Sequence, residues 1–186
     1  MEERRTNRRS LVLLALLLVA LPLTAGACGQ DKQDANEPSG TYKVDVISAA
    51  FPGRQRLGET SHLRITVKNQ DDKELPDLAI SVEGFSQRVD DTTLATPVRN
   101  IWLVNRPPFN SDSSFTDTWT LGKVPAGATR TADWTVTAVR AGTYSLRYRV
   151  SAGTDGKAKA ELPDGTPPRG SFIARITRSA RTTQVN

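Results

Sequence analysis

The side chains that most often carry out catalysis or bind metals are scarce in this sequence. Of 186 residues, one is histidine (His62), one is cysteine (Cys28) and one is methionine (Met1). Because a site of histidine or cysteine ligands needs several such residues, these single residues exclude that class of metal site. A catalytic triad could use only His62, which shares the outward face of a predicted strand with Arg64 and Lys68. We therefore expect a surface histidine and no active site.

Acidic residues occur in adjacent pairs at 71–72 and 90–91, a feature that glycosidases and calcium sites can also show. Both pairs stand in sequence typical of turns, where Asp side chains bond to nearby backbone groups. Asp112 and Asp117 could join the second pair in a calcium site, although no spacing motif supports one. The alternative function, a hydrolase or metal-dependent enzyme, would need a concave site that joins His62 to several carboxylates. We expect a non-enzymatic protein without a cofactor.

A long insertion, residues 86–121, contains aromatic and arginine side chains that could bind a ligand. The candidate ligand-binding residues are Trp102, Arg106, Phe109 and Trp119. On one interpretation the rings are exposed and stack on a sugar, peptide or polymer, as in a carbohydrate-binding module. On the other, residues 101–104 and 115–121 are two short strands whose aromatic side chains fill the core. Exposed rings would favour the first interpretation.

The net charge of +5 decreases to about +3 once residues 1–27, with their four arginines and two glutamates, are set aside. The remaining basic residues are spread along the chain, which argues against nucleic-acid binding. Five outward residues of predicted strands could form one basic sheet face for anionic envelope polymers if their strands are neighbours. They are Arg64, Lys68, Arg147, Arg149 and Arg175. As an alternative, these charges only keep an exposed sheet soluble.

The first 27 residues have the layout of a signal peptide. A short basic segment, MEERRTNRRS, leads into an apolar run from Leu11 to Leu23. This run of 13 residues is shorter than the ~20 residues of a membrane-spanning helix. Residues 8–12, RRSLV, also resemble a twin-arginine export signal, so the sequence leaves the route of export open. We expect an exported protein with an N-terminal helical signal segment.

The end of this segment, residues 23–29 (LTAGACG), resembles the lipobox of bacterial lipoproteins. The resemblance implies that Cys28 becomes the lipidated N-terminus and anchors the protein to the outer face of the cytoplasmic membrane. Alternatives are a single-pass N-terminal anchor and a secreted protein. Residues 28–40 are polar and contain Gly and Pro, which predicts a flexible tether.

Beyond Thr41 apolar and polar residues alternate with a period of two, which is typical of half-buried antiparallel strands. The clearest inward-facing sets are Leu63, Ile65 and Val67; Leu78, Ile80 and Val82; Ala132, Trp134, Val136 and Ala138; and Tyr144, Leu146, Tyr148 and Val150. We expect segments 42–46, 63–67 and 78–82 to lie side by side in one sheet. Segments 157–162 and 170–177 are expected to pair with each other, and residues 179–186 to be a polar tail.

Three segments, LGETSHLRITVKN, VPAGATRTADWTV and AGTYSLRYRVSAG, resemble bacterial immunoglobulin-like domains of the CARDB type, and Tyr144 resembles a tyrosine corner. The fold class is therefore expected to be all-β: a single immunoglobulin-like antiparallel sandwich of about seven or eight strands over residues 41–178. The resemblance implies a binding or assembly module of the cell envelope. Its partners would be the membrane, through the lipid anchor, and an envelope polymer or protein.

Overall fold

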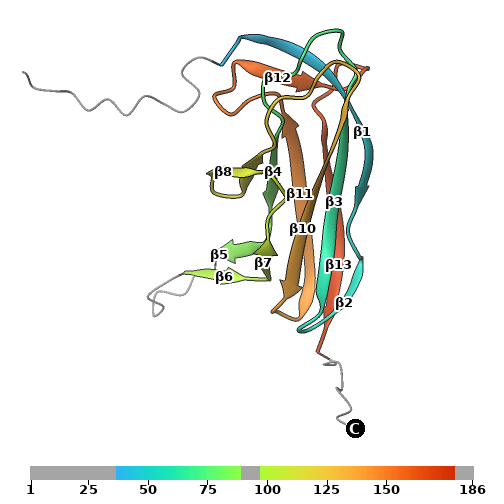
Figure 1. Cartoon of the computed structure of the whole chain (residues 1–186). Helices are drawn as coiled ribbons and strands as arrows, with labels where there is room; N and C mark the ends of the chain where they lie inside the picture. Colours follow the sequence, from blue (N-terminus) through green and yellow to red (C-terminus); the bar gives the residue numbers. More distant parts are fainter. Residues whose placement is uncertain (1–36, 89–96, 179–186) are drawn as a thin grey trace, which may run out of the picture. The chain divides into compact units, whose positions relative to one another are not determined.

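The computed structural model describes residues 37–88 and 97–178, which form strands and loops without a helix (Figure 1). The all-β fold class is thus confirmed. No helix in these two ranges is long and apolar enough to cross a membrane. The signal segment 1–27, Cys28, the pair at 90–91 and the tail 179–186 lie outside the described residues, so the predictions for them remain predictions.

Two sheets and a small hairpin make up the domain. The five-stranded sheet has the order β12 (Ala158–Glu161), β1 (Gly40–Ala50), β3 (Thr60–Asn69), β10 (Thr129–Ala138), β7 (Trp102–Arg106). The six-stranded sheet has the order β2 (Arg54–Arg56), β13 (Arg169–Thr177), β11 (Gly142–Ser151), β4 (Ala79–Glu83), β9 (Thr118–Thr120), β8 (Asp112–Phe115). The hairpin pairs β5 (Ser86–Arg88) with β6 (Val98–Asn100) and projects from the sandwich (Figure 1).

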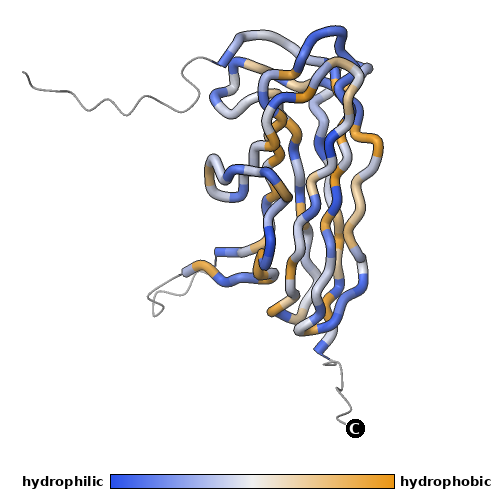
Figure 2. The backbone as a smooth tube through the Cα atoms, viewed as in Figure 1, coloured by the Kyte–Doolittle hydropathy of each residue, from blue (hydrophilic) through white to orange (hydrophobic). Residues whose placement is uncertain are grey.

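Alternation along the long strands places the core between the two sheets. Leu63 and Ile65 of β3 and Trp134 of β10 are fully buried, and they share one cluster with Ile80 of β4 and Leu146 of β11. Apolar and polar positions alternate visibly along these strands in Figure 2. The predicted inward sets are confirmed, except that Tyr144 and Tyr148 are only partly buried. Because successive strand side chains point to opposite faces, this alternation is what lets both sheets bury one face.

The strands differ from the sequence expectations in two pairings and in their number. β4 lies in the six-stranded sheet, where it pairs with β11 and β9, so it is not beside β1 and β3. β12 and β13 do not pair with each other, because β12 joins β1 in parallel and β13 pairs with β11. The described chain also has 13 strands, more than the seven or eight expected, since the insertion itself supplies five short ones.

The predicted tyrosine corner is present at the start of β11. The hydroxyl of Tyr144 donates a hydrogen bond to the carbonyl oxygen of Ala141 at 2.9 Å. A Cβ atom at Gly142 would lie only 2.7 Å from the Tyr144 ring, so the ring can fold back over this backbone only because the residue is glycine. The corner fixes the connection between the two sheets.

The last residues of the predicted tether are bound to the domain. The carboxylate of Glu37 accepts hydrogen bonds from the backbone N–H groups of Asp155 (2.7 Å) and Ala158 (2.5 Å). The same carboxylate lies against Gly153, where a Cβ atom would overlap it. We call this contact of Glu37 with the β11–β12 loop the Glu37 clamp. Glu37, which was predicted to belong to the tether, thus contacts the sandwich directly.

Candidate binding surfaces

Trp102 is buried and forms part of the core. It is 1% exposed, and its indole N–H donates a hydrogen bond to the side-chain oxygen of Gln55 at 2.7 Å. Its ring makes edge contacts with Phe51 and Tyr144 at centroid distances of 5.5 and 5.9 Å. The exposed ring considered for Trp102 is therefore a wrong prediction. The alternative, in which residues 101–104 form a core-filling strand, describes this side chain correctly.

Trp119 is also buried, at 8% exposure. Its ring packs edge-on against Trp134 at 5.5 Å and against Phe85 at 6.1 Å. The prediction of an exposed ring is thus wrong here too. Both indoles belong to the shared core cluster, where large side chains fill the space between the sheets.

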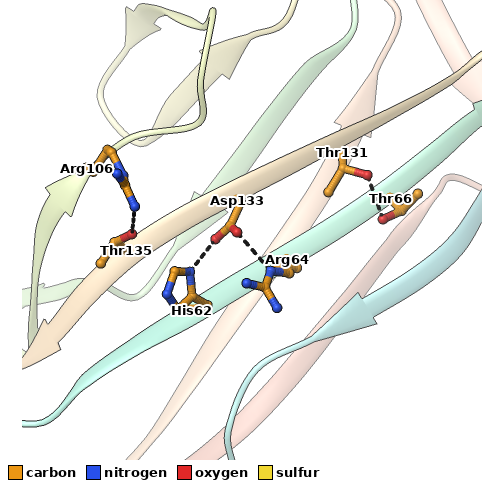
Figure 3. A network of polar contacts seen from close by, with 7 residues as sticks. All are labelled: His62, Arg64, Thr66, Arg106, Thr131, Asp133 and Thr135. Atoms are coloured by element: carbon orange, nitrogen blue, oxygen red, sulfur yellow. Dashed lines mark hydrogen bonds and ion pairs between the residues drawn. The ribbon is translucent and has the colours of Figure 1, made fainter.

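Arg106 and Phe109 are on the surface. Phe109 is 87% exposed and follows Pro107 and Pro108 at the end of β7. The Arg106 guanidinium donates a hydrogen bond to the hydroxyl of Thr135 on β10 at 3.3 Å, which holds it over the outer face of the five-stranded sheet (Figure 3). Of the four candidate ligand-binding residues, these two are available to a ligand.

His62 belongs to a polar network on the outer face of this sheet (Figure 3). His62 Nδ1 donates to one carboxylate oxygen of Asp133 at 2.7 Å, and Arg64 Nε donates to the other at 2.8 Å. The three side chains meet because Asp133 of β10 lies directly opposite Arg64 of β3. Partial burial raises the pKa of Asp133, but the hydrogen bonds from Arg64 and His62 outweigh it and bring the pKa below the ordinary value of 3.8.

This network resembles the Asp–His half of a triad but has no nucleophile. Within the described residues, the second ring nitrogen of His62 has no hydroxyl partner at hydrogen-bond distance. A shallow depression of about 640 Å³ beside it contains one carboxylate, Glu59, which accepts a hydrogen bond from the backbone N–H of Arg56 at 2.7 Å. Elsewhere in the described ranges, no three His, Cys, Asp or Glu residues gather as metal ligands. The geometry suits an ion-paired surface better than acid–base catalysis.

The five basic residues considered as one face divide between the two sheets. Arg64 and Lys68 lie on β3, whereas Arg147 and Arg149 lie on β11 and Arg175 on β13. The condition for a single basic face of all five, that their strands are neighbours, is therefore not met. The six-stranded sheet nevertheless has a basic outer face, because arginines of β2 and the start of β13 join those of β11. The sequence did not indicate these additions, since the short RQR segment of β2 carries no strand pattern of its own.

Two packed sheets, a shared core and a tyrosine corner define an immunoglobulin-like β-sandwich.

No protein-family model matches the chain, and no curated protein matches its sequence. Similar solved structures include a CARDB domain from Pyrococcus furiosus in complex with di-metal ions, with 11% identity and a TM-score of 0.47, covering 74% of this chain and 96% of that one. A cohesin module of a Clostridium perfringens family 33 glycoside hydrolase has 11% identity and a TM-score of 0.43, covering 74% and 98%. Native alpha-2-macroglobulin from Escherichia coli has 14% identity and a TM-score of 0.46, covering 74% and 17%. At these identities the likeness concerns the fold alone.

Proposed function

We propose that this protein is an exported lipoprotein whose sandwich is a non-enzymatic binding module of the cell envelope. The anchor is lipidated Cys28, which would hold the domain at the outer face of the cytoplasmic membrane. The basic start, the apolar run and the lipobox-like residues 23–29 support this part of the proposal. Two or more acyl chains suffice for stable attachment, at ~0.8 kcal/mol for each buried methylene.

The binding part of the proposal is carried by one observation: exposed apolar side chains are concentrated in the insertion. Eight large apolar side chains of the described residues are exposed, and five of them lie in the segment 86–121. These five are Val98, Leu103, Val104, Phe109 and Phe115. Because exposed apolar side chains cost free energy in water, their concentration in one segment favours a surface that a partner covers.

The edge strand β7 supports a protein partner. β7 is the last strand of its sheet and pairs only with β10. The backbone N–H of Val139 donates to the carbonyl of Ile101, so the backbone groups of residue 101 face β10. Because these groups alternate in direction along an antiparallel strand, those of Val104 point away from β10. An extended peptide can bond to such an open edge as an added strand, with pockets or exposed rings selecting its side chains. We therefore propose a protein partner whose extended apolar segment pairs with β7 and contacts Phe109.

The anchor is tested by the intact mass of the membrane-fraction protein in a bacterial host that processes lipoproteins. We expect a chain that starts at Cys28 and carries acyl groups, and we expect Cys28→Ala to lose both the acyl mass and membrane retention. A released, unacylated chain would mean a secreted protein. An uncleaved N-terminus would mean a single-pass anchor.

The binding edge is tested separately, with a photo-cross-linking amino acid placed at Phe109 in the native host. The matched control carries the same group at Ile47, which is 53% exposed on β1. We expect a discrete protein adduct from Phe109 and none from Ile47. Identical adducts from both positions, or none, would disprove a partner at β7. A heterogeneous polymer smear from Phe109 would instead favour the carbohydrate-binding alternative.

A further inference from the structure

Six arginines lie on the outer face of the six-stranded sheet, which β7 does not belong to. They are Arg54, Arg56, Arg147, Arg149, Arg169 and Arg175. Their outward direction follows from the alternation of the strands: the neighbours Gln55, Ala174 and Val150 are buried, and all six arginines are exposed. We call this surface the arginine face.

The strand register places arginines directly opposite one another on this face. Arg149 of β11 lies opposite Arg169 of β13, and Arg175 of β13 lies opposite Arg54 of β2. Like charges at directly opposite positions destabilise a sheet, whereas opposite charges stabilise it. The partner of Arg149 on its other side is Ser81, which carries no charge. Two such pairs on one face therefore favour a bound anion that neutralises them.

Acidic side chains do little to neutralise this surface. Glu83 is ion-paired with Arg147 at 3.4 Å, and this pair is solvent-exposed. Within residues 37–88 and 97–178, neither Arg149 nor Arg169 has an acidic oxygen within 4.0 Å. The guanidinium donors of this pair thus point into solvent without an anionic partner from the described chain.

The arginine pair borders a hollow in the sheet surface. A shallow depression of about 750 Å³ is lined by Arg147, Arg149 and Arg169 together with the hydroxyl-bearing residues Ser81 and Ser171. Glu83 also lines it, and its carboxylate is already paired with Arg147, which leaves Arg149 and Arg169 for an anion. Cross-strand neighbours are separated by ~5 Å, so the two guanidinium groups can reach one anion between them. Hydroxyl groups at the rim can add neutral hydrogen bonds to the same anion.

We propose that this depression binds a phosphate group of a linear phosphate-bearing polymer. A single guanidinium group can donate two parallel hydrogen bonds to the two oxygens of a carboxylate. Two guanidinium groups together suit an anion with more acceptor oxygens, such as phosphate. Arg175 follows Arg169 by six residues on β13, about 20 Å along an extended strand, so a chain lying along β13 reaches the second arginine pair. This binding is independent of the peptide site proposed at β7, because it uses the other sheet.

The test is a titration of the full chain, in detergent micelles and about 0.15 M salt, with linear polyphosphate. The variant is Arg149→Gln with Arg169→Gln. Its control, Lys68→Gln with Arg130→Gln, removes the same charge from the five-stranded sheet. We expect the variant to bind about tenfold or more weakly, since charge-assisted hydrogen bonds are lost, and the control to bind as the wild type does.

Several outcomes would overturn this proposal. If polyphosphate binds the variant and the control equally weakly, binding reflects the overall positive charge and not the arginine pair. Equally tight binding of polygalacturonate would mean that the site does not select phosphate. Binding only to vesicles of anionic phospholipid would make the face a membrane contact. A urea titration without ligand verifies folding: removing the opposed charges should leave the variant at least as stable as the wild type.

Discussion

Some buried polar side chains in this domain have specific hydrogen-bond partners, and Gln55 is the clearest case; Ser61 Oγ and the indole nitrogen of Trp134 are buried without a partner within the described residues. It is 2% exposed, and its amide both donates to the carbonyl of Pro52 at 2.9 Å and accepts from the indole of Trp102. A buried polar atom that loses its partner costs the free energy of its desolvation. Gln55 therefore links the short strand β2 to the edge strand β7 through a single side chain.

Replacing Gln55 with leucine should expose the cost of that link. In Gln55→Leu the Trp102 N–H stays buried without an acceptor, so we expect the free energy of unfolding to decrease by about 1–3 kcal/mol. The measurement is urea unfolding followed by tryptophan fluorescence. The double variant with Trp102→Phe should recover part of the loss, because the orphaned donor is then gone. Additive losses in the double variant would contradict this account.

The lowered pKa of Asp133 predicts a pH-dependent contribution to stability. Its pKa in the folded protein lies below the ordinary value of 3.8. The stabilisation is therefore fully present above about pH 3.8 and is lost as the pH falls through the folded-state pKa. We expect Asp133→Asn to be less stable than the wild type at pH 7 by up to about 1 kcal/mol, since solvent screens this exposed network. In urea unfolding at a pH below the folded-state pKa, where the carboxyl is protonated in both the folded and the unfolded protein, the difference should disappear.

A matched control for this experiment is Asp112→Asn. The carboxylate of Asp112 takes no part in an ion pair within the described ranges. We expect this variant to differ little from the wild type at either pH. A difference for Asp133→Asn that stays constant with pH would show that its carboxylate charge does not stabilise the fold.

At the scale of single residues, the inward face of the long strands could be predicted because their alternation is regular. The burial of Trp102 and Trp119 was one of two interpretations between which the sequence could not decide. They lie on strands of five and three residues, which are too short to show a period, and a tryptophan suits a binding surface as well as a core. Phe109 and Arg106 were proposed by the same reasoning, and only long-range packing separates the two outcomes.

At the scale of elements, the Glu37 clamp joins the beginning of the domain to the β11–β12 loop. Glu37→Gln weakens charge-assisted hydrogen bonds, and Gly153→Ala places a methyl group where the carboxylate lies. We expect both variants to speed hydrogen exchange at the amides of Asp155 and Ala158, as measured by NMR. Glu161→Gln, a nearby change of the same kind, should leave those amides unchanged. Unaltered exchange in all three variants would show that the clamp does not protect the loop.

The sequence indicated which segments form strands better than it indicated which strands pair. β4 and β3 show the same alternation, yet they lie in different sheets. Alternation records only which face of a strand is buried, whereas the choice of partner depends on contacts with distant strands such as β11 and β9. The parallel partner of β1 was missed for the same reason, because β12 follows it by more than a hundred residues.

At the scale of the whole domain, one shared core predicts one cooperative transition. Leu63 of the five-stranded sheet and Leu146 of the six-stranded sheet are both buried in the same cluster. We expect Leu63→Ala and Leu146→Ala each to lower the free energy of unfolding by about 2–5 kcal/mol. Tryptophan fluorescence and far-ultraviolet circular dichroism should give coincident urea transitions in both variants. Separate transitions would mean that the two sheets unfold independently.

If the domain is held by its N-terminus, the Glu37 clamp decides where a mechanical load enters the fold. A pull on the anchor would reach the clamp first and then β1, which pairs with β12 over residues 40–43 and with β3 over residues 44–50. Force directed along β1 shears these ladders, so their hydrogen bonds share the load and resist it together. The tension must cross the ladders of β1 with β3, β3 with β10 and β10 with β7 before it distorts the binding edge. The proposed binding edge is thus separated from the anchored strand by three strand ladders.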